Sequence, residues 1–396
     1  MHPEITYTNR MKTVAVIFGS RSTEHDVSVV TALASIIKPL ELSRQYKVEA
    51  VYIAKDGAWY WDDKLKDIAL FSSGAITDFL HKTQPASVRF DGGMTLVKSS
   101  GIAGRKTSRK IDVVFPATHG TYGEDGSLMG LLRMTNVPFV GCDQDASVLA
   151  MDKVLAKLAA TAHGLPTSNM EYADKFSYER DPHQFVQKVE KSLKYPLFVK
   201  PAHLGSSIGI SRVKDRKELD NALEVAFHYD DKVLVEEEVG NLIEVTLPIM
   251  GNDTLTPALL ERPLTHAEDF FDFETKYMGG GKKGGAKAKG AQGYSELPAK
   301  LDEKLYKKAE ALGLDVYRAL GCSGIARVDL LIDSKTDKVY FNEVNPLPGG
   351  LYQHNWRAAG VSGVELVERL VRLAEERWQT VQRQDTVFST NYLQQF

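Results

Sequence analysis

Two strand-like segments near the end of the chain carry acidic side chains inside otherwise apolar runs. The first spans residues 327–331 (RVDLL), and the second spans residues 339–346 (VYFNEVNP). If these strands pair as a hairpin, Asp329, Glu343 and Asn345 can lie side by side. Hard oxygen donors in that arrangement suit Mg²⁺, which binds through one or two carboxylates together with substrate phosphates. The pattern therefore predicts a magnesium site for a nucleotide triphosphate, with two solvated strand ends as the alternative.

The bulk composition is that of a globular protein. The chain has 396 residues, 43% hydrophobic and 26% charged, which leaves room for two or three domains. The net charge of −3 gives no reason to expect nucleic acid or an anionic membrane as a partner. No apolar run approaches the roughly 20 residues that a membrane span needs, and no signal peptide is evident. Cys142 and Cys322 have apolar neighbours, so we expect core thiols and a cytoplasmic location.

The first part of the chain alternates buried strands with helices. Residues 14–18 (VAVIF) are typical of a buried parallel strand, and a helix is expected after them through Ile37. Further strands are expected at 48–53 and 113–116. This alternation predicts an α/β domain with a doubly wound parallel sheet, in which ligands bind at the carboxyl ends of the strands. Residues 60–110 are only weakly patterned and support no assignment.

The middle of the chain indicates a second unit. One helix is expected over 146–163, because Gly164 and Pro166 follow it as a stop signal. Strands are expected at 197–200, 209–213 and 233–238. The loop between the first two of these strands consists mainly of small residues, which makes it a candidate for ligand binding.

The remainder of the chain predicts a third unit, with a strand at 244–247, the acidic hairpin, and helices at about 301–320 and 362–379. The segment 279–293 is rich in Gly and Lys, and no packed core could order it by itself. We read it either as a solvated insertion or as a mobile cationic lid. The expected division is an N-terminal α/β domain, a central subdomain and a C-terminal subdomain with this loop, with boundaries 1–145, 146–238 and 239–396.

The small-residue loop of the second unit is a candidate phosphate site. Lys200 ends the preceding strand, and the loop contains Gly205, Ser206 and Ser207. Small residues let backbone N–H groups approach phosphate oxygens closely, and a lysine adds a point charge. The spacing is not that of a Walker A motif, so an ordinary hairpin turn stays open as the alternative.

The order of the motifs resembles the D-alanine–D-alanine ligase family of ATP-grasp carboxylate–amine ligases. Eight segments carry the resemblance: 19–28 (GSRSTEHDVS), 119–126 (HGTYGEDG), 151–153 (MDK), 199–207 (VKPAHLGSS), 244–251 (EVTLPIMG), 273–277 (FETKY), 326–329 (ARVD) and 341–345 (FNEVN). It implies an ATP-grasp fold and the ADP-forming ligation of two D-alanines, or of D-alanine and a related acceptor, for peptidoglycan synthesis. It also implies ATP with two Mg²⁺ ions (Mn²⁺ as an alternative) and a homodimer.

The resemblance assigns a nucleotide-binding and metal-binding set by position. Phosphate-binding lysines, an adenine hinge, a ribose-binding acid and a loop lysine correspond to Lys153 and Lys200, Glu236 and Glu237, Glu244, and Lys276. The magnesium ligands correspond to Asp329, Glu343 and Asn345.

The resemblance also assigns residues to the amino acid substrates. Glu24, Ser206 and Tyr277 correspond to a hydrogen-bonded triad at the substrate amine and the closing loop. His119 would lie near the substrates. Arg327 would stabilise the tetrahedral intermediate, since a positioned donor lowers the energy of a developing oxyanion.

The chain departs from the family after Asn345, where a Ser-Leu pair usually receives the carboxylate of the second amino acid. Gly349 keeps the turn glycine, but His354 and Asn355 stand at the positions of that pair. Sites built to hydrogen-bond a polar group discriminate by up to ~10⁴–10⁵, so a different acceptor, such as another amino acid, a hydroxy acid or a peptide, stays open. Tyr277 argues in the other direction, because the resemblance implies a tyrosine at this position when the nucleophile is an amine and not a hydroxy acid. A non-catalytic nucleotide-binding descendant is a third hypothesis, disfavoured because the catalytic arginine and metal ligands are all present.

Overall fold

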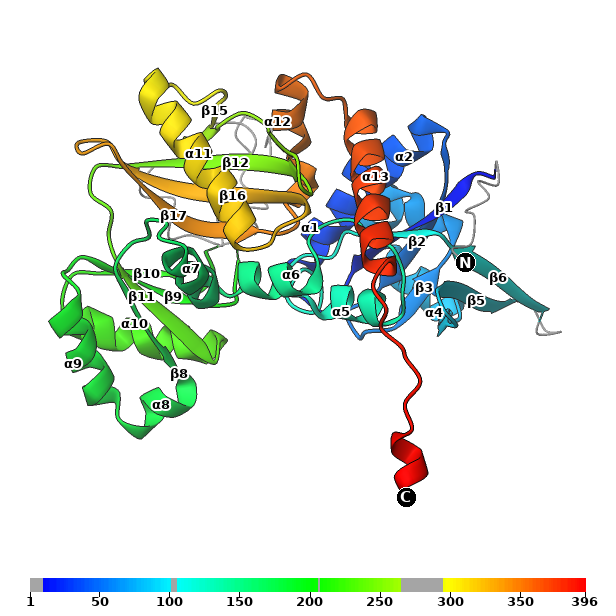
Figure 1. Cartoon of the computed structure of the whole chain (residues 1–396), viewed down its shortest axis with the longest axis horizontal. Coiled ribbons are helices and arrows are strands. Elements are labelled where there is room, and N and C mark those ends of the chain that lie inside the picture. The colour runs from blue at the N-terminus through cyan, green and yellow to red at the C-terminus, as the bar shows by residue number, and fades with distance from the viewer. Residues whose placement is uncertain (1–9, 101–104, 206, 265–294) are drawn as a thin grey trace.

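The computed structural model describes residues 10–100, 105–205, 207–264 and 295–396, and three four-stranded sheets dominate it (Figure 1). One sheet falls in each of the three expected units. The C-terminal sheet lies over the central sheet, and the N-terminal sheet lies beside this pair (Figure 1). Within these ranges, none of the helices is long and apolar enough to span a bilayer.

The N-terminal sheet has the strand order β3-β2-β1-β7. Its strands are β1 (Lys12–Gly19), β2 (Tyr46–Ile53), β3 (Trp59–Trp61) and β7 (Val113–Pro116). The strand β1 pairs in parallel with β2 and β7, and β3 is antiparallel to β2. Val16 and Phe18 pack in one core and Ala15 and Ile17 in another, because successive side chains point to opposite faces. Both faces of the sheet are therefore covered, and the α/β prediction is confirmed.

One face of this sheet is covered by a continuous helical run. It consists of α1 (His25–Val30), the π-helical segment η1 (Thr31–Ile37) and α2 (Lys38–Ser43). The run passes the expected end at Ile37 and stops where Arg44 adopts a left-handed conformation (φ 57°). The helix α5 (Ser127–Met134) covers the opposite face.

Residues 60–110 form regular structure, although the sequence supported no assignment there. The elements are η2 (Asp63–Lys66), α3 (Ile68–Ser72), α4 (Ile76–Lys82), β4 (Ser87–Phe90), β5 (Met94–Ser100) and β6 (Arg105–Ile111). The three strands form an antiparallel sheet. Met94 and Leu96 are fully buried, but polar residues occupy most other positions of these strands. Only one face of this sheet is apolar. The alternation of apolar and polar residues is therefore too weak in these strands to predict them from the sequence.

The central unit is an antiparallel sheet of order β10-β9-β11-β8 with helices on one side. Its strands are β8 (Met170–Asp174), β9 (Leu197–Pro201), β10 (Ser211–Val213) and β11 (Lys232–Glu237). Its helices are α8 (Lys175–Arg180), α9 (Pro182–Ser192) and α10 (Arg216–Tyr229). The strands expected in this unit are present, and β8 is an additional one.

The single helix expected over 146–163 is two helices, α6 (Gln144–Met151) and α7 (Lys153–Ala162). Asp152 separates them with an extended backbone (φ −88°, ψ 104°). Its carboxylate accepts hydrogen bonds from the N–H groups of Val154 and Leu155, at 2.9 and 3.0 Å. The expected single helix is therefore interrupted at Asp152, because this acidic residue caps a second helix.

The C-terminal sheet has the order β13-β12-β16-β17. Its strands are β12 (Leu242–Gly251), β13 (Leu255–Pro257), β16 (Gly324–Asp333) and β17 (Lys338–Asn345), and β14 (Arg262–Pro263) pairs with β15 (Ser295–Glu296) beside it. The helix predicted at about 301–320 is present as α11 (Glu303–Ala319), and it packs against this sheet.

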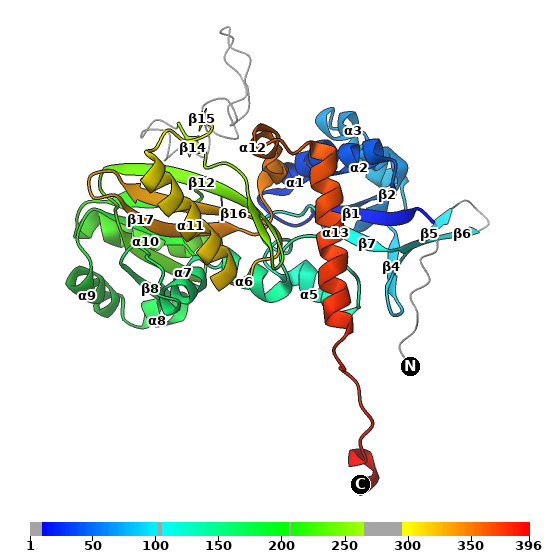
Figure 2. The same ribbon diagram turned by 45° about the horizontal axis from the view of Figure 1, so that its top comes forward.

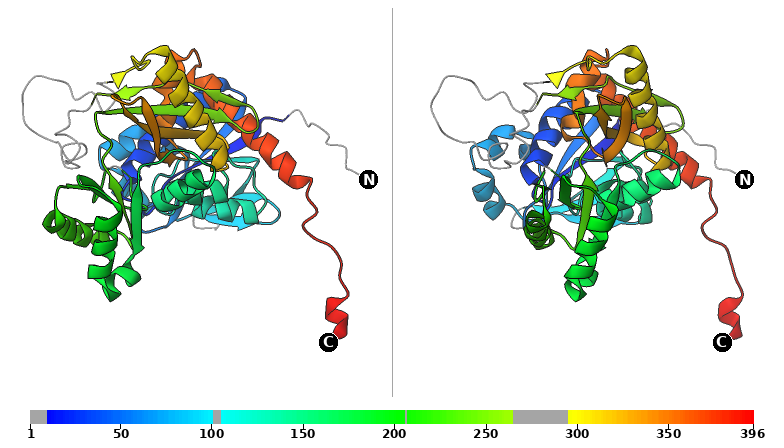
Figure 3. Two further views of the ribbon diagram at one scale, coloured as in Figure 1. Left: turned by 60° about the vertical axis from the view of Figure 1, so that its left-hand side comes forward. Right: turned by 90° about the vertical axis from the view of Figure 1, so that its left-hand side faces the viewer.

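The chain then returns to the N-terminal unit through η6 (Gly349–Tyr352), α12 (Gln353–Ala358) and α13 (Gly363–Gln382). Figure 2 shows α13 beside the N-terminal sheet. Lys12 pairs with Glu375 at 2.5 Å, and the Ser43 hydroxyl donates to Glu368 at 2.7 Å. After α13 the chain runs away from the body to a short turn, η7 (Tyr392–Gln395) (Figure 3).

The two cysteines are buried and free, which confirms the prediction of core thiols. Cys142 lies just before α6, and Cys322 lies between α11 and β16. The Cys142 thiol is 3.7 Å from the carbonyl oxygen of Ile325.

Candidate active site

The acidic hairpin is formed by β16 and β17, and it brings its polar side chains together as the spacing predicted. Asp329 is opposite Glu343, and Arg327 is opposite Asn345. The Asn345 amide donates a hydrogen bond to Asp329 at 3.1 Å. The register shifts directly after Asp329, so the ladder is irregular where the carboxylates meet.

Arg327 donates two hydrogen bonds to Asp329. Its Nε and Nη2 atoms donate to the two carboxylate oxygens at 2.7 and 2.6 Å. The guanidinium also lies over the ring of Tyr352, 5.2 Å from its centroid. Burial alone would lower the pKa of Arg327, but the Asp329 carboxylate outweighs it and raises that pKa above its ordinary value. The arginine is therefore a permanent cation with a fixed orientation.

Two lysines from the central part of the chain approach the hairpin. Lys153, the first residue of α7, places its Nζ 2.7 Å from the Leu204 carbonyl oxygen and 3.4 Å from Glu343 Oε2. Lys200, on β9, points its Nζ toward the side chain of Asn342 at 3.4 Å. Burial would raise the pKa of Glu343, but the nearby Lys153, Lys200 and Arg327 lower it overall. The carboxylate is thus held ionised by cations from three elements.

A buried charge cluster lies behind Lys200. Glu236 is 2% exposed, and it forms ion pairs with Lys200 through one oxygen and with Lys157 through the other. The Lys157 pair measures 2.9 Å, and the Ser168 hydroxyl donates to the same oxygen at 2.6 Å. Burial would raise the pKa of Glu236, but the two lysines lower it well below its usual range. The carboxylate expected at the adenine hinge is therefore occupied in holding two lysines.

Lys157 and Ser168 were not predicted as parts of the site. Lys157 lies one helical turn after Lys153, inside an otherwise small and apolar helix, and is 1% exposed. A lysine on the buried face of such a helix is the one signal that could have found it, since lysines are almost never fully buried unless paired. The Ser168 side chain gives no comparable signal in the sequence.

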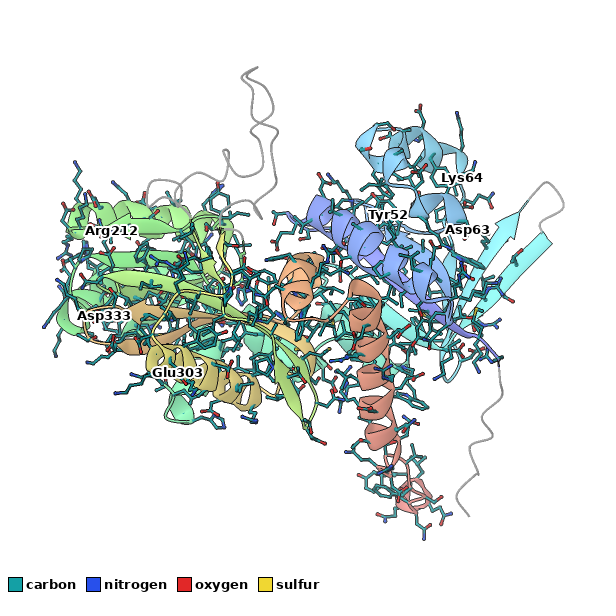
Figure 4. The ribbon with its side chains drawn as sticks, turned by 90° about the horizontal axis from the view of Figure 1, so that it is seen from above. Tyr52, Asp63, Lys64, Arg212, Glu303 and Asp333 are labelled. Atoms are coloured by element: carbon teal, nitrogen blue, oxygen red, sulfur yellow. The ribbon has the colours of Figure 1, made fainter. Side chains whose placement is uncertain are left out.

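Glu237, the second acid of the expected hinge, contacts the segments before β8 and β9, and two further acids follow it along the chain. Glu237 accepts hydrogen bonds from the Lys194 N–H and the Asn169 amide, both at 2.8 Å. Glu238 receives two hydrogen bonds from Arg212, at 2.8 and 2.6 Å, and Figure 4 labels this arginine on the central unit. Glu244 is half-buried on β12, opposite Leu331 of β16. These acids surround the junction between the central and C-terminal sheets.

Glu24 connects the N-terminal unit to the small-residue loop. It precedes α1, and its carboxylate lies against the backbone of Gly120 and Gly205. A Cβ atom would lie 3.1 Å from the carboxylate if built on Gly120 and 3.2 Å if built on Gly205. Glycine at both positions therefore makes room for this carboxylate. The other predicted members of the triad, Ser206 and Tyr277, lie outside the described residues, as do Lys276 and the segment 279–293.

His119 is buried and held by neighbours that the sequence analysis missed. Its Nε2 atom is 2.9 Å from the Thr31 hydroxyl, and its Nδ1 atom is 3.9 Å from the Glu124 carboxylate. The Gly350 N–H donates to the same Thr31 hydroxyl at 2.9 Å. Thr31 thus links His119 to the turn that follows the acidic hairpin.

The departure from the family pattern lies in this turn and in α12. Gly349 begins η6, and the three residues after it all have positive φ, at 59°, 52° and 53°. The His354 imidazole donates to Glu261 through Nε2, which is 2.8 and 3.0 Å from the two carboxylate oxygens. Its ring lies 4.7 Å from that of Tyr352, which in turn stacks on Arg327. The Tyr352 ring therefore lies between His354 and Arg327, the candidate catalytic residue.

Asn355, expected beside His354 in the acceptor pocket, is fully buried. Its amide donates to the Leu259 carbonyl at 2.9 Å and to Glu261 at 3.1 Å, and its oxygen accepts from the Leu259 N–H at 3.0 Å. The side chain is used to fix the backbone that carries Glu261. Of the pair, His354 has the partly accessible side chain, at 26% exposure.

Glu261 is a buried acid that no motif pointed to. Burial would raise its pKa, but hydrogen bonds from His354, Ser295 and Asn355 lower it overall. The carboxylate is thus an anion whose partners all come from distant parts of the chain, which is why local patterns did not reveal it.

Family models match most of the chain. The D-ala D-ala ligase N-terminus matches residues 13–142, and the D-ala D-ala ligase C-terminus matches residues 159–372. A D-alanine–D-alanine ligase of Chlorobium phaeovibrioides is 36% identical over 371 residues, covering 92% of this chain and 97% of the relative. That of Acetivibrio thermocellus is 35% identical over 381 residues, covering 93% and 96%.

Solved structures give the same answer. The D-alanine–D-alanine ligase of Coxiella burnetii superposes with a TM-score of 0.77 at 27% identity, covering 94% of this chain and 97% of the other. The VanG D-Ala:D-Ser ligase of Enterococcus faecalis gives 0.73 at 30% identity, covering 92% and 100%. The predicted fold class is confirmed, and the chain belongs to the D-alanine–D-alanine ligase family, whose members are ATP-dependent ligases with the ATP-grasp fold.

Proposed function

We propose that this protein joins two molecules of D-alanine, with ATP converted to ADP and phosphate, and so supplies a dipeptide precursor of peptidoglycan. The observation that carries the proposal is the convergence of Lys153, Lys200 and Arg327 on the acidic hairpin. A bound triphosphate needs cations around it, and the two lysines beside the acidic hairpin provide them. The names of the relatives supply the substrates.

The chemistry begins at the carboxylate of the first D-alanine. A carboxylate is a poor electrophile, so its oxygen attacks the γ-phosphorus, the bond to the β-phosphate oxygen breaks, and ADP leaves. Lys153 and Lys200 would spread the negative charge during this transfer, which depends mainly on positioning and charge neutralisation. Glu24 would hold the ammonium group of the same substrate by a charge-assisted bond.

The second D-alanine then attacks the acyl phosphate. Its amine loses a proton, the new C–N bond forms, and phosphate leaves as the tetrahedral intermediate collapses. Arg327 would donate to the oxyanion of that intermediate, from the orientation fixed by Asp329 and Tyr352.

The residues of the hairpin fit a magnesium site. Two carboxylates and an amide oxygen form a hard donor set, and an ionised carboxylate keeps acceptor capacity beyond the two bonds from Arg327. We propose that Asp329, Glu343 and Asn345 hold Mg²⁺, with two ions expected and Mn²⁺ as an alternative. Bound there, the metal would supply positive charge that offsets the negative charge of the phosphate groups.

Three further points belong to this proposal. We propose functional units bounded at 1–145, 146–238 and 239–396, supported by one four-stranded sheet in each. A cytoplasmic location is supported by the two free, buried thiols. A homodimer rests on the family resemblance alone.

The second candidate is the same reaction with an acceptor other than D-alanine. It is supported by His354 and Asn355, which stand where the resemblance places a Ser-Leu pair, and by Glu261, which both side chains contact. A structural neighbour is itself named a D-Ala:D-Ser ligase.

An ADP-release assay separates these candidates. With Mg·ATP and D-alanine alone, we expect release of one ADP per dipeptide formed, and mass spectrometry should identify D-alanyl-D-alanine. Release that begins only when D-serine, another amino acid or a hydroxy acid is added supports the second candidate. No release with any acceptor, from protein that is folded by circular dichroism, contradicts both candidates.

Replacing Glu261 with glutamine tests the acceptor side. The variant loses the charge that holds His354, so we expect the KM of the acceptor to rise about tenfold, with the KM of ATP unchanged. Because the pKa of Glu261 is lowered, its contribution should be full above the ordinary glutamate value of ~4.3 and decline only as the pH falls below it. Initial rates against acceptor concentration between pH 4 and 8 measure both effects.

The matched control is Glu296→Gln. Glu296 lies on β15, beside β14, and pairs with Arg262 and Lys300 instead of His354. It should leave the acceptor KM unchanged. An acceptor KM that is equally unchanged in Glu261→Gln would show that the His354 cluster has no part in acceptor binding.

A further inference from the structure

His203 lies at the meeting point of three segments, one of which is the proposed phosphate-binding loop. It belongs to the small-residue loop, and its Nδ1 atom is 2.8 Å from Asp230, just before β11. Its Nε2 atom is 3.3 Å from Asp152, the residue that caps α7. One imidazole thus bridges two carboxylates that come from different elements.

Two of these segments, the small-residue loop and the residue before α7, also contact or precede Lys153. The Asp152 carboxylate caps the helix on which Lys153 is the first residue. The Lys153 backbone N–H donates to the Ala202 carbonyl at 3.0 Å, and its Nζ donates to the Leu204 carbonyl at 2.7 Å. Both carbonyls flank His203 in the loop. Any shift of the loop therefore moves the partners of Lys153 as well.

We propose that protonated His203 is a positioning residue that fastens the small-residue loop and Lys153 to each other for binding of Mg·ATP. The inference rests on the proposed function, since it assumes that this loop receives phosphates. An imidazole can bridge two carboxylates with two donated hydrogen bonds only when both of its nitrogens carry protons.

The charges around the imidazole favour that form. Asp152 and Asp230 face it directly, the exposed Asp231 lies 3.8 Å away, and Lys232 pairs with Asp152 at 2.5 Å. Hydrogen bonds to Asp152 and Asp230 outweigh burial and raise the pKa of His203 to about 9. The side chain is 38% exposed, on the wall of a cavity of about 620 Å³, so it can exchange protons with solvent.

His203, Asp230 and Asp231 also have the composition of a metal site. A metal-bound histidine must offer a nitrogen lone pair, whereas Nδ1 lies 2.8 Å from Asp230 and Nε2 lies 3.3 Å from Asp152, so each nitrogen has a carboxylate that can accept its proton. The geometry therefore favours the positioning role.

The pH dependence follows from the raised pKa. The contribution of His203 to holding the loop is full at a pH below about 6.5, the pKa of histidine in the unfolded chain. It is lost as the pH rises through about 9, the pKa of His203 in the folded protein. We expect the Kd of Mg·ATP, measured by calorimetry, to rise across this range in the wild type. In His203→Asn it should already be about tenfold higher at pH 7 and should lack this pH dependence.

Three companion measurements make the test decisive. His203→Arg keeps a permanent cation, so it should restore affinity at pH 7 and abolish the loss near pH 9. His228→Asn alters another histidine on the wall of the same cavity, whose ring packs edge-to-face against Tyr229, and this variant should behave as the wild type. An NMR titration should show the His203 imidazole with a raised pKa that falls in Asp230→Asn.

The outcomes also separate this inference from the proposed function. If His203→Asn binds Mg·ATP as tightly as the wild type at pH 7, the positioning role is overturned while the ligase activity stands. If the wild type binds no Mg·ATP, the proposed function fails first, and the NMR titration still decides whether His203 bridges the two carboxylates.

Discussion

An Arg327→Ala variant is expected to lose roughly 100- to 1000-fold in kcat, the effect of removing one oxyanion donor in comparable sites. Arg327 is fixed by two hydrogen bonds to Asp329 and by the Tyr352 ring, so its direction is set before substrate arrives. An orientation fixed in advance costs no reorganisation during the reaction, which is why such donors act mainly on kcat. Steady-state ADP release at saturating ATP and D-alanine measures the change.

Two other variants test whether a loss of kcat in Arg327→Ala comes from the loss of the positioned donor. Arg327→Lys keeps the charge but cannot donate to both oxygens of Asp329, so it should retain more activity than alanine and far less than the wild type. Arg212→Lys breaks a similar two-bonded pair with Glu238, away from the hairpin, and should leave kcat at saturating ATP unchanged. If Arg327→Ala kept kcat within about threefold of the wild type, the proposed oxyanion role would be wrong.

The parts of this fold that the sequence predicted are those that depend on local patterns. The strand β1 is an uninterrupted apolar run because it is buried on both faces, and such runs stand out. The acidic hairpin stands out for the opposite reason, since carboxylates inside apolar strands demand an explanation. Asp152 shows the limit of pattern reading, because a helix cap that satisfies the next turn looks like one more polar residue in a single helix.

The parts of the site that the sequence did not reveal are those that depend on distant pairings. Glu261 gains its meaning from His354 and Asn355, and Lys157 gains its meaning from Glu236. In each case the partners lie on different elements, so no spacing rule connects them. Position within a motif also does not show which partners a side chain has: Asn355 is bound to Leu259 and Glu261, and its part in acceptor binding stays a prediction.

The largest effect on stability is expected for Glu236→Gln. The glutamine leaves Lys157 and Lys200 close together in the interior without the anion that both contact. Removing one partner of a buried charge cluster typically costs about 3–5 kcal/mol, because an uncompensated buried charge remains. We expect a loss of that size in the free energy of unfolding at pH 7, measured by urea denaturation, and weaker binding of Mg·ATP through misplacement of Lys200.

The pH dependence and the controls identify the cause. The lowered pKa of Glu236 means that its contribution is full above the ordinary value of ~4.3 and declines as the pH falls below it, so the deficit should shrink under acid conditions. Adding Lys157→Met to Glu236→Gln removes one of the two stranded cations and should recover part of the stability. Glu237→Gln, which loses only bonds to Lys194 and Asn169, should cost far less. Equal losses for the two glutamates would mean that the ion pairs of Glu236 contribute no more to stability than the hydrogen bonds that Glu237 accepts from neutral groups.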